Sequence, residues 1–237
     1  MDRFDGFEGM LLTDQVRSTG AILANTSKGY RRARFTVAHE LGHFLMERHE
    51  LTSDGGFTCR AQDMRETRDG RQHVRQESQA NQFAAELLAP TYLVTPLLSP
   101  EPDLRDAQRM RDHLDISLEV CVRRMIGGRD EVLAAVWSFK GEVRYLVKGS
   151  GFPYVTVSRG DRLPPISAAY RAVQNAQPGF TEFAEAHPLS WTSRTDVDLY
   201  EQTRMSNNGH AVTLLWADIP DDDDDPDRPE LSVPTFR

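Results

Sequence analysis

The pentapeptide His39-Glu40-Leu41-Gly42-His43 constrains the fold of this chain more than any other part of the sequence. Apolar residues at positions 35, 38, 41 and 45 recur at helical spacing around it, which predicts an amphipathic helix. Two histidines four residues apart on a helix project from the same face and can hold one metal ion through their imidazole nitrogens. The fold must therefore bury one face of this helix and offer another to a metal.

Glu40 and Gly42 indicate what such a metal would do. Glu40 lies about 100° around the helix from His39, where its carboxylate would meet a water activated by the metal rather than the metal itself. A metal that polarises a scissile carbonyl, with a carboxylate that takes the proton of the water, is the arrangement of a hydrolytic site. Gly42 costs a helix about 1 kcal/mol relative to alanine, and it leaves room for a close neighbour. A helix with two surface histidines and no metal, the alternative, explains neither this glycine nor the apolar setting.

A third metal ligand is expected downstream, because a catalytic zinc ion usually takes three protein ligands and leaves one position for water. The segment 77–90, ESQANQFAAELLAP, has a helical pattern. With about 100° per residue, Ala80 and Ala84 lie within about 80° of Glu77, whereas Glu86 lies about 180° away. Glu77 therefore points to the interior, where an unpaired carboxylate would be costly. We predict Glu77 as the third ligand and Glu86 as a surface charge.

Other side chains near these two helices are weaker candidates. His49, Glu66 and His73 also follow the motif, and the two histidines flank a polar stretch at about 50–74 that predicts a long loop, so we expect both at the surface. Cys59 is expected to be a free thiol of that loop. Asn81 shares the face of Glu77 and is a candidate to orient a ligand histidine by a hydrogen bond, although an amide without a metal role fits its position equally well.

The whole chain predicts an α+β fold with three parts. Residues 1–127 form a mainly helical domain with a small sheet, residues 130–219 form a smaller α+β domain, and residues 220–237 form an acidic disordered tail. The first domain is expected to hold a strand at 21–25, the motif helix, and helical regions at about 77–88 and 102–126. The second is expected to hold a hairpin (132–139 and 142–149), a strand at 153–158, a helix at 166–176, and a hairpin with an Asn-Gly turn between 197–205 and 211–219.

Charge and composition exclude several functional classes. The formal net charge is −8, but residues 218–237 contribute −6 of this through eight acids and two arginines. The remaining −2 shows no basic surplus, so direct nucleic-acid binding is not expected. No run of about 18 apolar residues predicts a membrane span, and the first residues lack the basic start and apolar centre of a signal peptide. A cytoplasmic location is therefore expected.

Two stretches, RFTVAHELGHFLMERH (34–49) and ESQANQFAAELLAP (77–90), resemble the ImmA/IrrE family of zinc metallopeptidases. The segments GAILAN before the first and ISLEVCVRRM at 116–125 are also similar to parts of this family, so the resemblance covers about 20–126. It implies a thermolysin-like core in which His39, His43 and Glu77 hold the metal and Glu40 is the general base. It further implies selective cleavage of helix-turn-helix (Xre-like) repressors, with consequences for transcription and stress responses. Residues 130–219 match no family that we can name, and only analogy assigns them a sensor or docking role.

Two functional hypotheses follow. The first is a cytoplasmic zinc endopeptidase that makes limited cuts in a regulatory protein, with a DNA-binding repressor as its substrate. The strand at 21–25 could pair with an extended substrate by strand addition. The second is a metal-containing binding module that sequesters a repressor or a toxin without cleaving it, through its acidic tail. Zn²⁺ suits two imidazoles and a carboxylate, and Mn²⁺ stays open as the working metal, as does the oligomeric state.

Overall fold

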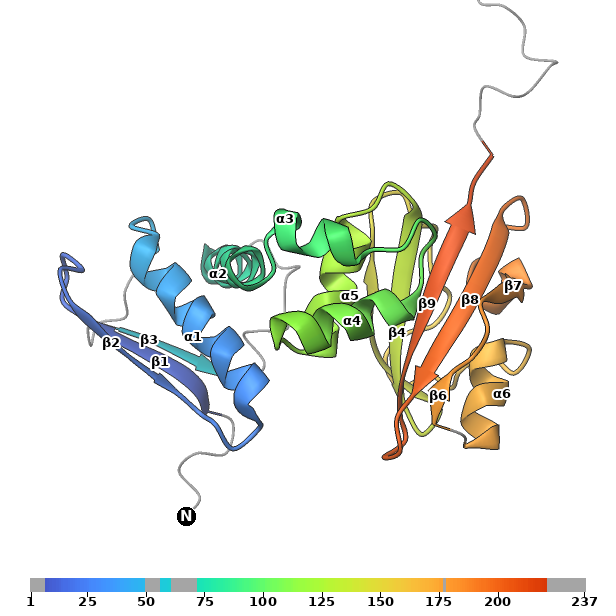
Figure 1. The fold of residues 1–237 in the computed structure, drawn as a ribbon, viewed down its shortest axis with the longest axis horizontal. Coiled ribbons are helices and arrows are strands. Elements are labelled where there is room, and N and C mark those ends of the chain that lie inside the picture. The colour runs from blue at the N-terminus through green and yellow to red at the C-terminus, as the bar shows by residue number, and fades with distance from the viewer. Residues whose placement is uncertain (1–6, 50–55, 61–71, 177, 221–237) are drawn as a thin grey trace, which may run out of the picture. The chain divides into compact units, whose positions relative to one another are not determined.

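A computed structural model of the chain describes residues 7–49, 56–60, 72–176 and 178–220 (Figure 1). The chain is α+β, as expected, and divides into two compact units, Met1–Arg129 and Asp130–Arg237. The acidic tail lies outside the described residues from position 221 onward. Within the described part, no helix combines the length and apolar character needed to cross a membrane. The elements of the first unit are β1 (Phe7–Thr13), β2 (Gly20–Ala24), α1 (Tyr30–Leu45), β3 (Gly56–Arg60), α2 (Gln72–Leu88), α3 (Thr91–Val94), η2 (Thr95–Leu97), α4 (Leu104–Leu114) and α5 (Leu118–Gly127).

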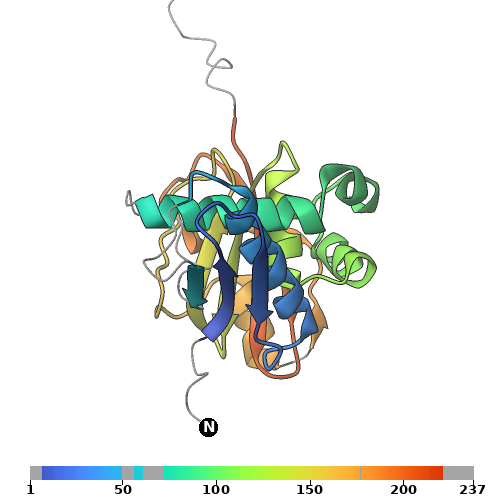
Figure 2. The ribbon, with the colours of Figure 1, turned by 90° about the vertical axis from the view of Figure 1, so that its left-hand side faces the viewer.

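The first unit stacks a small sheet, α1 and α2 in that order. The sheet order is β2-β1-β3, with β1 antiparallel to both neighbours. Helix α1 packs against β1 and β2 on one side and against α2 on the other. Figure 1 shows α2 end-on, and Figure 2 looks onto the sheet with α1 behind it and α2 running across α1. The motif helix is thus enclosed on two sides, which explains its two buried faces.

Two strands of this sheet differ from the sequence-based expectation. The central strand β1 was not predicted, and β3 falls inside the stretch 50–74 that was predicted as one long loop, so that prediction was wrong for residues 56–60. The helix predicted at 77–88 also begins earlier, at Gln72. The segment Gly56–Arg60 has only two apolar residues, Phe57 and Cys59, too few to mark a strand by themselves. Its strand conformation comes with hydrogen bonding to β1, which a local sequence pattern does not report.

The buried carboxylate of Glu8 ties β1 to the beginning of α1. Glu8 is fully buried, and its oxygens accept hydrogen bonds from Lys28 Nζ (2.6 Å) and Arg32 Nε (2.7 Å). Burial raises the pKa of Glu8, but the hydrogen bonds from Arg32 and Lys28 outweigh this effect and hold the pKa below its ordinary value. Glu8 is therefore ionised and paired in the native state.

The helical region predicted at 102–126 is two helices rather than one. Asp115 ends α4 with a left-handed backbone (φ 52°), and Ser117 caps α5 by accepting a hydrogen bond from the amide of Val120 at 3.3 Å. Aspartate is one of the few residues that adopts this conformation at little cost. The apolar spacing continues through the break, so periodicity alone marked 102–126 as one helical region and did not show where the first helix ends.

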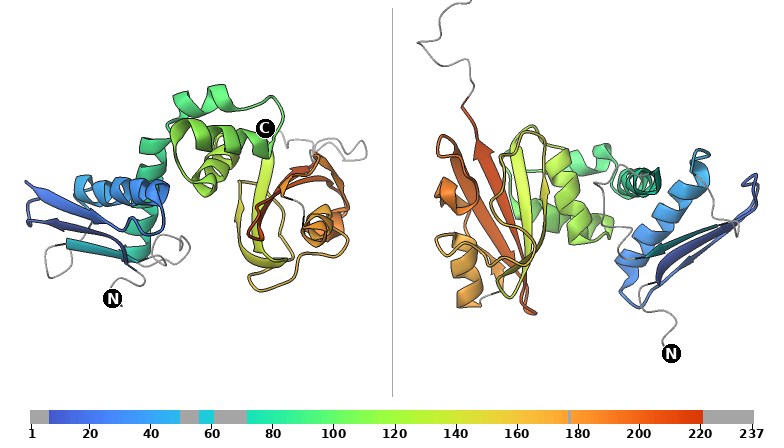
Figure 3. Two further views of the ribbon diagram at one scale, coloured as in Figure 1. Left: turned by 60° about the horizontal axis from the view of Figure 1, so that its bottom comes forward. Right: turned by 180° about the vertical axis from the view of Figure 1, so that it is seen from behind.

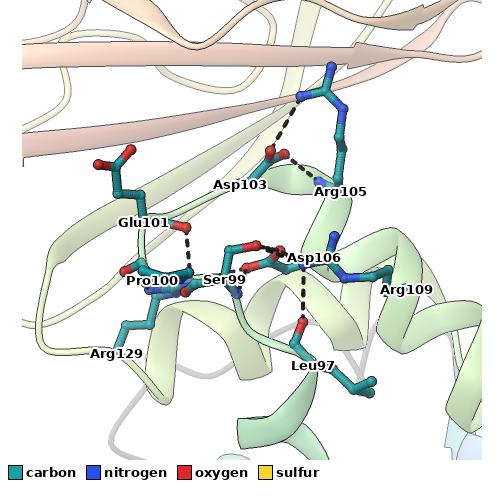
Figure 4. Close-up of polar contacts among 9 residues, drawn as sticks. All are labelled: Leu97, Ser99, Pro100, Glu101, Asp103, Arg105, Asp106, Arg109 and Arg129. Atoms are coloured by element: carbon teal, nitrogen blue, oxygen red, sulfur yellow. Dashed lines mark hydrogen bonds and ion pairs between the residues drawn. The ribbon is translucent and has the colours of Figure 1, made fainter.

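A buried ion pair joins the end of α5 to the beginning of α4 (Figure 4). Asp106 is fully buried and accepts hydrogen bonds from Arg129 Nη2 (3.0 Å) and from the amide and hydroxyl of Ser99 (both 2.8 Å). The side chain of Arg129, 6 % exposed, also donates to the carbonyls of Ser99, Pro100 and Glu101. Because the guanidinium and the carboxylate are both multiply hydrogen-bonded, this pair fixes the segment before α4.

The second unit is a six-stranded antiparallel sheet with one helix on its face (Figure 3). The strand order is β5-β4-β9-β8-β6, and β7 pairs with β8. Both predicted hairpins are present, and their turns contain Lys140-Gly141 (φ 49° and 79°) and Gly209 (φ 84°). The elements are β4 (Val132–Phe139), β5 (Glu142–Lys148), α6 (Ala168–Asn175), β6 (Gly179–Phe180), β7 (Ala184–Ala186), η3 (Pro188–Ser190), β8 (Asp198–Met205) and β9 (His210–Asp218).

The core of the second unit contains the segment 153–158, which was wrongly predicted as a strand, and the buried acid Glu201. The strand predicted at 153–158 forms only an isolated bridge from Val155 to Thr192, although Val155 and Val157 are buried in the core. Their alternation reflects burial without a ladder of hydrogen bonds. Glu201 is buried and accepts hydrogen bonds from the amide of Ala168 at the start of α6 and from Trp191 Nε1 (3.1 Å). Burial raises the pKa of Glu201, and these hydrogen bonds only partly oppose the effect.

Candidate metal centre

Three buried side chains from α1 and α2 converge on one point. His39 and His43 lie in the C-terminal half of α1, Glu77 lies in α2, and the exposed fractions of these residues are 0 %, 0 % and 2 %. The Nε2 atoms of the two histidines are 3.1 Å apart, and the Glu77 carboxylate oxygens lie 3.1 Å from Nε2 of His39 and 3.3 Å from Nε2 of His43. The three residues that helical geometry singled out are therefore brought together by the tertiary structure.

These separations fit a tetrahedral metal ion. Ligand atoms about 2.0–2.1 Å from zinc stand roughly 3.3 Å apart at tetrahedral angles, close to the spacing of the three donor atoms here. Two imidazole nitrogens and one carboxylate oxygen form the donor set of many catalytic zinc sites, which leave the fourth position for water. The arrangement can therefore hold one such ion, and its donor set does not by itself exclude Mn²⁺.

Close packing of small residues sets the distance between the two ligand-bearing helices. A Cβ atom added at Gly42 would lie 3.0 Å from Cδ1 of Phe83 and 3.3 Å from the Cα of Ala80. Ala38, Ala80 and Gly42 are all buried. The close neighbour that Gly42 was expected to accommodate is thus α2 itself, and this contact brings Glu77 within reach of the histidines.

The electrostatics favour the metal-binding states of Glu77 and His43. In the site without a metal, burial raises the pKa of Glu77, but hydrogen bonds and charge interactions with His39 and His43 outweigh this effect and hold the pKa well below its ordinary value. Those hydrogen bonds use a proton on Nε2, which a bound metal ion would replace. Burial lowers the pKa of His43, because a cationic ring is disfavoured away from water. A carboxylate and a neutral imidazole are the metal-binding forms of these side chains.

Asn81 orients His39. Its Oδ1 lies 3.1 Å from Nδ1 of His39, and an amide oxygen can only accept a hydrogen bond. In the neutral ring that a metal binds, the contact therefore places the proton of His39 on Nδ1 and leaves the lone pair on Nε2, toward Glu77. Of the two interpretations of Asn81 that the sequence allowed, the structure supports the orienting one. Glu86, expected at the surface, is exposed and pairs with Arg124.

The expectation that His49 lies at the surface was wrong. His49 is 2 % exposed, and its Nδ1 lies 2.8 Å from Nδ1 of His43, while its Nε2 lies 3.0 Å from Oε1 of Gln79. The reason is tertiary: Arg17, in the β1–β2 turn, donates hydrogen bonds to the backbone carbonyls of His43, Met46 and His49, which folds the chain back under the end of α1. Since His49 follows the helix end, no helical periodicity could place it.

The side chains of the remaining candidates lie outside the described residues. This holds for Glu66, for the predicted loop thiol Cys59 and for His73, whose backbone lies in the first turn of α2. Their predicted roles stay predictions.

Glu40 lies beneath the central strand of the sheet. It is fully buried, and a Cβ atom added at Gly9 of β1 would lie 2.7 Å from its Oε1 and 2.3 Å from Cγ2 of Thr36. The backbone of β1 thus packs directly against this carboxylate, next in sequence to the ligand His39. A glycine at this point of β1 allows the sheet to approach the helix so closely.

One comparison with known proteins identifies the first unit. The model of the M78 peptidase family, described as the IrrE N-terminal-like domain, matches residues 5–125, which is 121 of the 237 residues. No curated protein matches the chain. The matched range contains α1 and α2 with the complete ligand cluster, and it confirms the resemblance seen in the two helical stretches. The chain therefore belongs to the M78 (ImmA/IrrE) peptidase family.

Proposed function

We propose that the protein is a zinc-dependent endopeptidase with a thermolysin-like core that makes limited cuts in a regulatory protein. The observation that carries the proposal is the buried cluster of His39, His43 and Glu77, with Glu40 next to the first ligand on the same helix. A purely structural metal site is usually closed by four protein ligands. Membership of a peptidase family supports hydrolysis of a peptide bond as the reaction.

The residues of the site have distinct tasks in this proposal. Zn²⁺ bound by the three ligands would supply Lewis acidity, which polarises the scissile carbonyl and makes water a stronger acid. Glu40 takes a proton from the attacking water and passes it to the leaving amine, as a general base and then a general acid. Burial of Glu40 under β1 excludes bulk water from one side of the carboxylate and limits its motion. Asn81 holds His39 with its metal-binding nitrogen toward Glu77.

An extended substrate segment is proposed to add to the edge of the sheet at β2. A pocket of about 400 Å³ lies beside this strand, lined by Ile22 and Gly20 of β2 and by Leu41 and Phe44 of α1. Ser18 and Thr19 also line it, but the lining is mainly apolar and suits one apolar side chain of a strand that continues the sheet. Strand β3 forms the opposite edge, so protection from hydrogen exchange on substrate binding should distinguish the two edges.

The proposed substrate is a helix-turn-helix (Xre-like) DNA-binding repressor. Support comes from the resemblance to the ImmA/IrrE family, which implies cleavage of such repressors. The absence of a basic surplus in this chain also favours a protein partner over direct contact with DNA. Cleavage of a regulator within the cytoplasm would connect the enzyme to transcription and stress responses.

Metal content tests the assignment of the site. Zinc bound per chain should stay near the wild-type value in Glu40→Gln, because Glu40 is not a ligand, and should fall strongly in His43→Ala and Glu77→Ala. Glu86→Ala, which removes an exposed carboxylate from the same helix, is the matched control and should bind zinc normally. Unchanged zinc in Glu77→Ala would refute Glu77 as the third ligand.

Cleavage in cells tests the function. New protein N-termini are compared in host cells that express the wild type or Glu40→Gln at equal levels. A few wild-type-only termini, clustered in one regulator, are expected; many unrelated termini would refute selectivity. No difference, with metal bound in both proteins and an intact partner co-purifying, would refute the peptidase and support a binding module. In that case deletion of residues 220–237 should abolish partner capture.

A further inference from the structure

The second ligand histidine, His43, contacts another imidazole where His39 contacts an amide. Nδ1 of His43 lies 2.8 Å from Nδ1 of His49, and the two ring centroids are 4.9 Å apart. A neutral imidazole has one donor nitrogen and one acceptor nitrogen. A hydrogen bond between these two Nδ1 atoms therefore requires that one ring carries its proton there and the other does not.

Gln79 decides which ring carries the proton. Its Oε1 lies 3.0 Å from Nε2 of His49, and an amide oxygen can only accept. The proton of His49 is thus on Nε2, and its Nδ1 carries a lone pair that can accept a hydrogen bond. It follows that His43 donates from Nδ1, so that Nε2 of His43 keeps the lone pair that faces Glu77 at 3.3 Å.

The backbone around His49 is fixed well enough to hold this geometry. Its amide donates to the carbonyl of Met46 at 2.9 Å, and its carbonyl accepts from the guanidinium of Arg17. The same guanidinium bonds the carbonyl of His43 at 3.1 Å. The ring of His49 is also buried, so no bulk water competes for its Nδ1.

We propose that His49 is a positioning residue of the metal centre: its Nδ1 accepts a hydrogen bond from Nδ1–H of His43. Gln79 in turn holds His49 in the tautomer that is protonated at Nε2. His39 and His43 then receive the same orientation from two different acceptors, Asn81 and His49, and both direct Nε2 toward Glu77. The inference rests on the proposed metal site. Its consequence is that metal affinity depends on a side chain that never touches the metal.

The first test reads the tautomer directly. Long-range ¹H–¹⁵N correlation spectra are recorded on the zinc-loaded full-length protein, labelled with ¹⁵N in histidine and assigned with single histidine variants. His49 is expected to be protonated at Nε2 and unprotonated at Nδ1. A proton on Nδ1 of His49 would overturn the proposal.

The second test compares two substitutions by zinc affinity, measured in competition with a chromophoric chelator. His49→Phe keeps a ring but removes the acceptor, and it is expected to weaken zinc binding by about 10- to 100-fold. His49→Asn places an oxygen near the position of Nδ1 and should restore most of the affinity. Glu47→Gln, an exposed change on the same segment, is the control and should match the wild type. Equal losses in the Phe and Asn variants would mean a packing role only and would refute the proposal.

A third variant keeps the test decisive if His49→Phe does not fold. Gln79 is exposed, so Gln79→Leu should fold normally while it removes the acceptor that sets the tautomer of His49. The zinc affinity of Gln79→Leu should fall, whereas Gln79→Glu keeps an acceptor and should retain the wild-type affinity. Identical affinities in the two variants would contradict the proposal that Gln79 sets the tautomer of His49. None of these measurements needs a substrate. A protein that shows them all but cuts nothing would refute the peptidase and leave this inference standing.

Discussion

Replacement of Gly42 by alanine sets two calculable effects against each other. Alanine in the interior of a helix is favoured over glycine by about 1 kcal/mol, so helix propensity alone predicts a more stable protein. The added methyl, however, would lie 3.0 Å from Phe83 and 3.3 Å from the Cα of Ala80, both closer than ordinary carbon contacts. The ring of Phe83 can turn, but the backbone at Ala80 lies in a packed helix and must move as a unit.

The structure indicates that the steric effect prevails. Overpacking of a well-packed core costs about 1–3 kcal/mol, and the middle of this range, about 2 kcal/mol, exceeds the gain in propensity of about 1 kcal/mol. We expect Gly42→Ala to lower the free energy of unfolding of the metal-free protein by about 1 kcal/mol. Zinc affinity should also drop by roughly tenfold, because Glu77 moves with α2 and metal–ligand distances tolerate only about 0.2 Å.

Urea unfolding in the presence of EDTA and chelator competition for zinc measure the two effects separately. Gly127→Ala is the matched control: Gly127 ends α5, and an added Cβ there has no neighbour within 4 Å. This control should be as stable as the wild type or more stable, with normal zinc affinity. If Gly42→Ala is instead stabilised like the control and binds zinc normally, the argument that helix contact at Gly42 positions Glu77 is wrong.

Three further predictions follow from the described residues. Gly9→Ala should displace the carboxylate of Glu40 and slow cleavage about 100-fold, with zinc content unchanged; a normal rate in a cleavage assay would show that β1 does not position the base. Asp106→Asn leaves the buried guanidinium of Arg129 without its counter-charge and should lower the free energy of unfolding in urea by about 3 kcal/mol, and a loss below about 1 kcal/mol would refute this. Arg32 and Lys28 lower the pKa of Glu8 in the folded state, so the contribution of Glu8 to stability is complete above its unfolded pKa of about 4.3 and is lost as the pH falls further. The free energy of unfolding, measured from pH 6 to pH 3, should therefore fall less steeply in Glu8→Gln than in the wild type, and equal slopes would refute this.

The sequence alone determined the local features of this protein. The spacing of His39 and His43 and the apolar face that Glu77 shares were sufficient to nominate a metal cluster, since helical geometry relates residues a few positions apart. The two hairpins of the second unit were predictable for the same reason, because turn residues such as Lys140-Gly141 act on their immediate neighbours.

Features that depend on distant parts of the chain were decided by the tertiary structure. The strand β3 exists through its pairing with β1, the burial of His49 depends on Arg17 some thirty residues earlier, and the break between α4 and α5 interrupts an apolar pattern that continues through it. Backbone hydrogen bonds and side-chain caps of this kind are not encoded in the periodicity of one segment. The physical reason is that a pattern reports which face of an element is buried, whereas the partner that buries it is chosen by the packing of the whole domain.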